Sequence, residues 1–295
     1  MTIDAAVLQC GDRILDLARP RIMGVLNVTP DSFSDGGHHA RIDQALARAR
    51  AMQAEGADLL DIGGESTRPG AIPVTLEEER RRVLPVIEAL RTELDVPLSV
   101  DTMKPELMRE AVAAGAGMLN DVNGFRAAGA LEAAFVAARE HGVALCTMHM
   151  QGEPQSMQQA PQYRDVVAEV GGFLRQRVAE LEGAGVPRGQ ILIDPGFGFG
   201  KTLDHNVALF RGLSRLAGIG PPLLVGVSRK SMIGQLLGER PVAGRGPGSA
   251  VAGLLAAQAG ARVLRVHDVA ATRDALALYL ALRPDRGDGQ DDRGN

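Results

Sequence analysis

Acids, amides and cations recur at one kind of position in this 295-residue sequence, directly at the ends of short apolar runs. Carboxylate and amide groups there suit a flat heterocycle with an amino-pyrimidinone edge, because a carboxylate accepts from adjacent N–H groups. These groups belong to Asp101, Asn120 and Asp194. Cations from separate loops suit phosphate or pyrophosphate, helped by backbone N–H groups at loop–helix junctions. These cations are Arg68, Lys230, Arg265 and His267.

Taken singly, each of these residues also has a purely structural explanation. Asp101 could cap the helix expected from Pro105, and Asp194 could cap a turn. A ring of polar groups at nearly every apolar run is harder to explain in that way, because buried acids and amides cost free energy unless they are matched. The pattern therefore predicts one site that holds a polar heterocycle together with a phosphate group.

The elements that would position this ring are eight apolar runs, each followed by a helical pattern. The runs cover residues 22–28, 59–63, 98–101, 118–122, 143–148, 191–194, 223–227 and 263–266. Helices are expected at 43–55, 75–94, 105–114, 129–140, 163–182, 206–216, from Ser249 as a cap, and at 272–282. Strands that are apolar throughout are covered on both faces, and eight such units predict a (β/α)8 TIM barrel. A doubly wound open sheet is the weaker alternative, because no GxGxxG follows the first strand.

Two shorter segments lie outside the eight repeats. Residues 7–15 are typical of a small β-hairpin around the Gly11-Asp12 turn. We expect a single barrel domain over residues 1–282 and a polar, disordered tail over 283–295.

Composition narrows the classes of function. The net charge of -4 argues against broad binding of nucleic acid, which requires a basic face. Cys10 and Cys146 lie far apart without CxxC spacing, so a reducing compartment is expected. The N-terminus does not resemble a signal peptide, and no apolar segment is long enough to span a bilayer. These features predict a cytoplasmic protein without a membrane partner.

The loops add further candidates and exclude two motifs. Residues 29–37 follow the first run and are expected to act as a lid, since they carry Gly36 and Gly37. Loop aromatics such as Phe33, Phe197 and Phe199 either stack on a flat ligand or pack against their own scaffold. Residues 196–202 resemble a P-loop but begin after a proline where the first glycine is required. His38 and His39, placed in the first loop, lack the spacing of a zinc hydrolase.

These residues also carry a resemblance to a known family. Eight strings in order resemble dihydropteroate synthase, over about residues 21–268: NVTPDSFSDGG, DIGGESTRPGA, SVDT, NDV, MHMQG, DPGFGFGK, GVSRKSMIG and RVHDV. The resemblance implies a transferase of folate biosynthesis that is inhibited by sulfonamides. In its reaction p-aminobenzoate displaces pyrophosphate from 6-hydroxymethyl-7,8-dihydropterin diphosphate with the help of Mg²⁺, giving 7,8-dihydropteroate. It also implies a homodimer, for which the Ala/Leu-rich last helices offer an apolar face.

The resemblance implies a role for each matching residue. The pterin pocket would comprise Asp101, Asn120, Met148, Asp194 and Lys230. The diphosphate site would comprise Asn27, Arg68, Arg265 and His267, with Asn27 also a ligand of Mg²⁺. The p-aminobenzoate surface would comprise Thr67, Pro69, Phe199 and Ser228. The residues predicted to be catalytic are Asp35, Asp101, Asp194 and Lys230, with Asp35 brought to the reacting carbon when the first loop closes.

Two other functions share part of this pattern. Methyltransferases that move a methyl group from methyltetrahydrofolate to a corrinoid share the barrel and the pterin pocket, but they have no need of the SRK and RVHD cations. A non-catalytic pterin-binding paralogue is expected to have lost loop residues, whereas Asn27, Asp35 and Arg68 are all present here.

Overall fold

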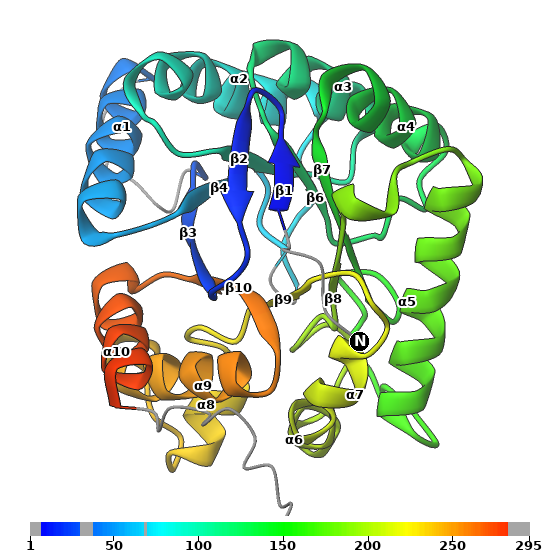
Figure 1. Cartoon of the computed structure of the whole chain (residues 1–295). Helices are drawn as coiled ribbons and strands as arrows, with labels where there is room; N and C mark the ends of the chain where they lie inside the picture. The colour runs from blue at the N-terminus through cyan, green and yellow to red at the C-terminus, as the bar shows by residue number, and fades with distance from the viewer. Residues whose placement is uncertain (1–6, 30–37, 68–69, 283–295) are drawn as a thin grey trace, which may run out of the picture.

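The computed structural model describes residues 7–29, 38–67 and 70–282, with the side chains of 38–41 excepted (Figure 1). Its centre is a barrel of eight strands, and every adjacent pair is parallel. The strands are β3 Arg21–Asn27, β4 Leu59–Gly63, β5 Leu98–Asp101, β6 Met118–Asp121, β7 Ala144–Met148, β8 Ile191–Asp194, β9 Leu223–Val225 and β10 Ala261–Val266. The barrel closes in the order β10-β3-β4-β5-β6-β7-β8-β9. The predicted (β/α)8 fold is confirmed.

Helices surround the barrel in Figure 1. They are α1 His38–Glu55, α2 Leu76–Glu93, α3 Pro105–Ala114, α4 Ala130–His141, α5 Val166–Gly183, α6 Leu203–Arg211, α7 Leu213–Ala217, α8 Ser231–Leu236, α9 Gly246–Gln258 and α10 Val269–Leu282, with short 3₁₀ turns at Arg188–Gln190 and Val242–Gly244. Each strand buries aliphatic side chains toward this ring, as Leu60 and Ile62 do from β4. Such burial on both faces is why the strands read as continuous apolar runs.

Several helix boundaries differ from those expected. The single helix expected at 206–216 is two helices, α6 and α7, separated at Gly212, where an added Cβ would lie only 2.7 Å from Val167. His38 and His39 belong to α1 and not to the preceding loop. Ser249 does not cap α9, which begins at Gly246 after Arg245. These differences come from tertiary contacts that local sequence patterns do not register.

The predicted hairpin is confirmed as β1 Val7–Cys10 and β2 Arg13–Asp16, paired antiparallel around the Gly11-Asp12 turn. Its inner side chains pack on residues toward the amino-terminal ends of the barrel strands, and together they form one apolar cluster. The cluster comprises Leu8, Cys10, Leu15, Leu17, Met23, Leu59, Met118, Ala144, Cys146, Leu192, Leu224 and Val263. Only glycine fits at position 117, because an added Cβ would lie 2.3 Å from the Cys10 carbonyl oxygen. The hairpin therefore covers the amino-terminal end of the barrel, which leaves the carboxyl end for the polar ring.

Both cysteines lie in this hairpin cluster. They are free and buried. Burial raises the pKa of Cys10 to about 12, so this thiol stays protonated at neutral pH. Within the part of the chain that the structure describes, no helix combines the length and apolar character needed to cross a membrane.

Candidate active site

The polar residues named from the sequence lie where the strands end. Asn27, Asp101, Met148 and Asp194 are the last residues of β3, β5, β7 and β8. Other members lie just before or after a strand end: Asn120, Ser228, Lys230, Arg265 and His267. Functional groups of a TIM barrel converge at this carboxyl end. Three predicted residues, Asp35, Arg68 and Pro69, lie outside the described residues.

A fully buried carboxylate, Asp61 on β4, organises the centre of this end of the barrel. It has no exposed surface and accepts from the Ser99 hydroxyl at 2.6 Å and the Asn120 amide nitrogen at 3.1 Å. The Arg265 Nε donates to its Oδ2 at 2.6 Å. Asp61 lies within the apolar run 59–63, and the sequence assigned it no role. The structure shows that it orients two predicted site residues at once.

Arg265 also joins the two predicted subsites. Its Nη2 donates to the Asp101 Oδ2 at 2.8 Å while its Nε stays on Asp61. The sequence had placed Arg265 with the diphosphate and Asp101 with the pterin. Burial raises the pKa of the Asp101 carboxyl, and the Arg265 charge opposes that rise. The ion pair therefore neutralises a buried carboxylate at the point where the two predicted subsites would meet.

The second half of the site combines an acid, an ammonium and an aromatic ring. Lys230 Nζ lies 4.4 Å from the centroid of the Phe199 ring and donates to the Phe197 carbonyl oxygen. Burial lowers the pKa of Lys230 to about 8, against the attraction of Asp194. Burial also raises the pKa of Asp194, whose Oδ1 accepts from the Gly196 N–H at 2.7 Å. An ammonium over a ring is a cation–π arrangement that a flat aromatic ligand can extend.

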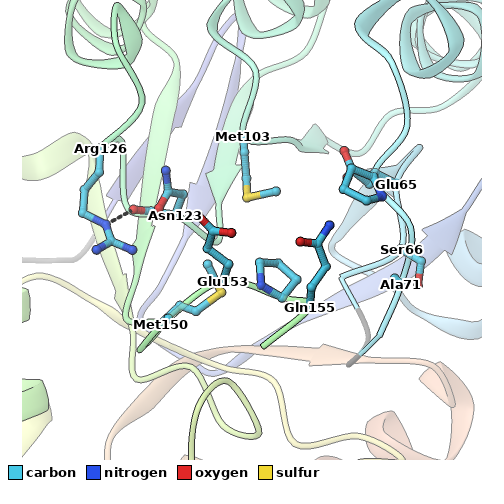
Figure 2. Close-up of a pocket in the computed structure, with 12 residues that line it drawn as sticks. Glu65, Ser66, Ala71, Met103, Asn123, Arg126, Met150, Glu153 and Gln155 are labelled. Atoms are coloured by element: carbon cyan, nitrogen blue, oxygen red, sulfur yellow. Dashed lines mark hydrogen bonds between the residues drawn. The ribbon is translucent and has the colours of Figure 1, made fainter. Parts of the chain in front are cut away.

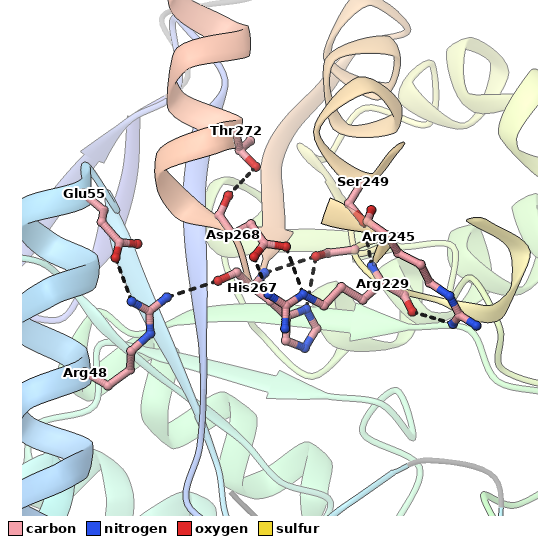
Figure 3. Close-up of polar contacts among 9 residues, drawn as sticks. Arg48, Glu55, Arg229, Arg245, Ser249, His267, Asp268 and Thr272 are labelled. Carbon is pink, nitrogen blue, oxygen red and sulfur yellow. Dashed lines mark hydrogen bonds and ion pairs between the residues drawn. The ribbon is translucent and has the colours of Figure 1, made fainter. Parts of the chain in front are cut away.

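His267 and Ser228 form a third group, and Figure 3 shows His267 beside the start of α10. The His267 backbone N–H donates to the Ser228 Oγ at 3.1 Å, and the ring Nδ1 lies 3.1 Å from the same oxygen. Arg48 of α1 holds the His267 carbonyl oxygen at 3.2 Å and pairs with Glu55. The loops after β9 and β10 thus meet through their predicted site residues.

The glycine-rich loop after β8 is built around a lysine that the sequence did not single out. Lys201 is only 3% exposed. Its Nζ donates to the carbonyl oxygens of Gly196 at 2.8 Å and Phe199 at 3.0 Å, and it lies 2.9 Å from the His149 Nδ1. Burial lowers the pKa of Lys201 to about 7 and the pKa of His149 to about 3, so the imidazole is a neutral acceptor. The Lys201 amino group fixes the loop that carries Phe199.

The two phenylalanines of this loop have different surroundings. Phe197 is fully buried and packs against Phe210, 5.8 Å between ring centroids, so it belongs to the core. Phe199 is partly exposed beneath Lys230. Met148 lies in a small apolar cluster with Val122, Met150 and Met157, against which Phe199 also packs. This cluster gives the polar site one apolar wall.

A cavity of about 530 Å³ adjoins that wall, between the loops that follow β4, β5, β6 and β7 (Figure 2). Met103 and Met150 line it, together with Glu65, Arg126 and Glu153. Among the described residues, none of the predicted site members lines this cavity. Thr67 lies two residues beyond Glu65 on the loop at its edge.

Comparisons with known proteins agree with this geometry. Residues 23–267 match the family described as pterin binding enzyme. The chain is 50% identical over 267 residues to dihydropteroate synthase of Escherichia coli K12, covering 90% of this chain and 93% of that protein.

Solved structures are equally similar. The Xanthomonas albilineans dihydropteroate synthase with 4-aminobenzoic acid has a TM-score of 0.88 and 54% identity, covering 95% of this chain and all of that one. The same enzyme is solved with 7,8-dihydropteroate. The Yersinia pestis enzyme with a sulfonamide drug has a TM-score of 0.86 and 48% identity, covering 93% and 98% of the two chains. The chain belongs to the dihydropteroate synthase family of pterin binding enzymes.

Proposed function

We propose that this chain is the transferase that joins p-aminobenzoate to 6-hydroxymethyl-7,8-dihydropterin diphosphate, releasing pyrophosphate and forming 7,8-dihydropteroate for folate biosynthesis. The observation that carries the proposal is the Asp61–Arg265–Asp101 arrangement, which places an anion-binding guanidinium beside acids suited to a pterin. The SRK and RVHD cations distinguish this reaction from methyl transfer to a corrinoid, which releases no pyrophosphate.

Separate groups of residues bind the pterin, the p-aminobenzoate and the diphosphate. The pterin edge meets Asp101, Asn120, Asp194 and Lys230 over the apolar wall at Met148. The p-aminobenzoate ring lies by Phe199, Ser228, Thr67 and Pro69. Arg265 can keep its Nε on Asp61 while its outer nitrogen turns from Asp101 to the diphosphate, together with His267, Arg68 and Asn27. Binding of the substrate thereby replaces one internal ion pair by two substrate contacts.

The chemistry follows from charge. Cations around the diphosphate neutralise the charge that develops on pyrophosphate as it leaves. The carbon that it leaves becomes part of a pterin cation, which Asp101, Asp194 and Asp35 stabilise. The neutral arylamine nitrogen then attacks that carbon, and the proton released as the C–N bond forms passes to water, so no strong base is needed. Lys230 holds the pterin and the arylamine in line by its place over Phe199.

The residues fit a Mg²⁺ ion that arrives with the diphosphate. Mg²⁺ usually takes one or two protein oxygens and completes its shell with water and substrate phosphates. The Asn27 side-chain oxygen at the end of β3 lies beside Gly63, where an added Cβ would be 3.7 Å from that oxygen. When bound, the ion would neutralise part of the pyrophosphate charge.

A direct assay tests the proposal. The purified protein is incubated with the dihydropterin diphosphate, p-aminobenzoate and Mg²⁺, and pyrophosphate release is measured. We expect release that depends on all three components, and a sulfonamide should compete with p-aminobenzoate. Binding of the pterin without release would identify a non-catalytic paralogue instead, and absence of both would overturn the proposal.

Removing the guanidinium of Arg265 tests the diphosphate assignment. Arg265→Ala is expected to weaken pyrophosphate binding by about 1.5–3 kcal/mol, the scale of a charged hydrogen bond. Arg262→Ala is the matched control, because Arg262 lies toward the other end of β10 and contacts Ala18. Isothermal titration with pyrophosphate and Mg²⁺ measures both variants. Unchanged affinity in Arg265→Ala would contradict the assignment.

The lowered pKa of Lys230 predicts an alkaline limit to activity. The ammonium form makes the cation–π contact, and it is lost as the pH rises through about 8. We therefore expect kcat/KM to fall above that pH, since this ratio reports groups of the free enzyme. Lys230→Arg should keep its charge and show no such limb. An identical alkaline limb in both proteins would assign it to a substrate or to another residue.

The homodimer implied by the sequence is also a proposal. Four side chains on the adjacent helices α9 and α10 are between 46% and 77% exposed: Val251, Leu255, Leu278 and Leu282. Burying such a patch favours association. Sedimentation of the protein should give a dimer, and Leu278→Asp should shift it toward monomer, whereas Ile14→Asp on the hairpin should not. The cytoplasmic location stays a prediction.

A further inference from the structure

Arg229 separates two site residues, Ser228 and Lys230, and its backbone is unusual. Its φ is 58°, in the left-handed region. A residue with a side chain seldom adopts that conformation, and it persists where the surrounding structure imposes it. At Arg229, contacts from the start of α9 and from the loop after β10 impose it.

The backbone of Arg229 is held from both sides by the start of α9 (Figure 3). Its N–H donates to the Ser249 Oγ at 2.9 Å, and its carbonyl oxygen accepts from the Arg245 Nη1 at 2.9 Å. Ser249 in turn donates to the Arg245 carbonyl oxygen at 2.6 Å. This explains why Ser249 is buried inside the helix and does not cap it.

The side chain of Arg229 reaches the next loop. Its Nε donates to the Asp268 Oδ2 at 2.9 Å, and its Nη2 pairs with the Oδ1 of the same carboxylate. Two parallel bonds of this kind fix direction as well as distance. Asp268 directly follows His267, and its carbonyl oxygen accepts from the Thr272 hydroxyl at 2.9 Å in the first turn of α10. The pair therefore joins the loop after β9 to the loop after β10.

The neighbours of this pair are the groups that meet the substrates. Ser228 accepts from the His267 N–H, so the p-aminobenzoate surface and the diphosphate site touch there. Lys230 extends from the other side of Arg229 to the Phe197 carbonyl and the Phe199 ring. A shift of either loop would change the spacing of both contacts.

We propose that Arg229 is a positioning residue of the reaction: its bidentate pair with Asp268 locks the two loops so that Ser228, Lys230 and His267 keep their spacing. This inference rests on the proposed function. Arg229 acts through its neighbours and is not assigned a contact with substrate. Misplacing binding groups by about 1 Å can lower a rate by about 100-fold.

The test uses Arg229→Gln, Asp268→Asn and the double variant. Each single change should raise the KM for p-aminobenzoate and lower kcat by at least about tenfold, which is less than the loss of about 100-fold for a 1 Å misplacement. The double variant should be no worse than either single one, because contacts within one pair are not additive. Arg229→Lys keeps the charge and should recover only part of the loss, since lysine lacks the fork. Additive effects, or variants with unchanged kinetic constants and only a lower Tm, would overturn the proposal.

Arg229→Gly separates the pair from the backbone. Glycine adopts a φ of 58° without strain, so it should keep the turn while it loses the ion pair. We expect it to be as defective as Arg229→Gln, and wild-type kinetics in this variant would contradict the inference. Glu239→Gly is the control, because Glu239 is also left-handed, at 59°, but is exposed.

Binding measurements keep this test independent of the proposed activity. Calorimetry with pyrophosphate and Mg²⁺, and separately with p-aminobenzoate, needs no turnover. Loss of affinity in the Arg229 and Asp268 variants relative to the Glu239 control supports the positioning role even if the wild-type chain releases no pyrophosphate. Equal affinities in all proteins would reject it, whereas an inactive wild type would reject the proposed reaction alone.

Discussion

Asp61→Ala is expected to lower the free energy of unfolding by about 3–5 kcal/mol, the scale for removing one member of a buried ion-paired network. Three donors meet on that carboxylate, from Ser99, Asn120 and Arg265. Without it the guanidinium of Arg265 keeps only Asp101 and is free to lean toward it. Activity should also fall in the fraction of the protein that stays folded, because Asn120 and Arg265 lose the carboxylate that holds both of them.

Chemical denaturation measures stability, the pyrophosphate-release assay measures activity, and calorimetric titration with pyrophosphate and Mg²⁺ measures affinity. Asp121→Ala is the matched control: Asp121 is equally buried on the next strand but one, and its oxygens accept from the backbone N–H groups of Asn123 and Phe125. That variant should also lose stability while keeping pyrophosphate affinity. Asp61→Ala with wild-type pyrophosphate affinity would show that Arg265 needs no anchor.

The barrel was predictable because its signal is local. A strand covered on both faces is apolar along its whole length, and the boundaries expected at 59–63, 98–101 and 191–194 match β4, β5 and β8. The prediction of a single helix at 206–216 was wrong because Gly212 lies against Val167 of α5, a contact that no pattern within the segment reveals. The prediction that Ser249 caps a helix was wrong for a similar reason, because its hydroxyl oxygen accepts from the distant Arg229 backbone N–H.

The site was predictable in its membership but not in its pairing. A polar residue at the end of a barrel strand belongs to the site by topology alone. Which residue bonds which depends on closure of the barrel: Arg265 and Asp61 lie 204 positions apart in sequence and meet through β10, β3 and β4. Asp61 was overlooked because its cationic partner, Arg265, reaches it only through that closure. Lys201 was overlooked because its partners are carbonyl oxygens of its own loop and the His149 ring, which no residue pattern marks.

Lys201→Met is expected to give a stability difference that grows with pH. In the folded chain the pKa of Lys201 is about 7, whereas the ordinary value is 10.5. Between these values the unfolded chain binds a proton that the folded chain does not, so the wild type gains stability as pH rises. The methionine variant has no such proton. The advantage of the wild type should therefore increase by up to about 1.4 kcal/mol per pH unit above pH 7.

Urea denaturation of both proteins between pH 7 and 9 measures this slope, because Lys230 and the other titrating groups are common to both and largely cancel. Lys104→Met is the control. Lys104 pairs with Glu65 and Glu79, and although burial opposes it, these carboxylates raise the pKa of Lys104. Its contribution is then fully present below 10.5, so its difference from wild type should be flat over the same range.

Lys201→Met should also weaken binding at the candidate active site. Methionine has nearly the length of lysine but leaves the Phe199 carbonyl oxygen without its donor, at about 1–3 kcal/mol if it stays buried, while the Gly196 carbonyl oxygen keeps only the Phe199 N–H. The loop can recover part of that cost by opening, which moves Phe199 away from Lys230. We therefore expect a higher KM for p-aminobenzoate in Lys201→Met. A pH-independent stability difference would instead show that Lys201 stays charged throughout, and an unchanged KM would show that the loop holds Phe199 without it.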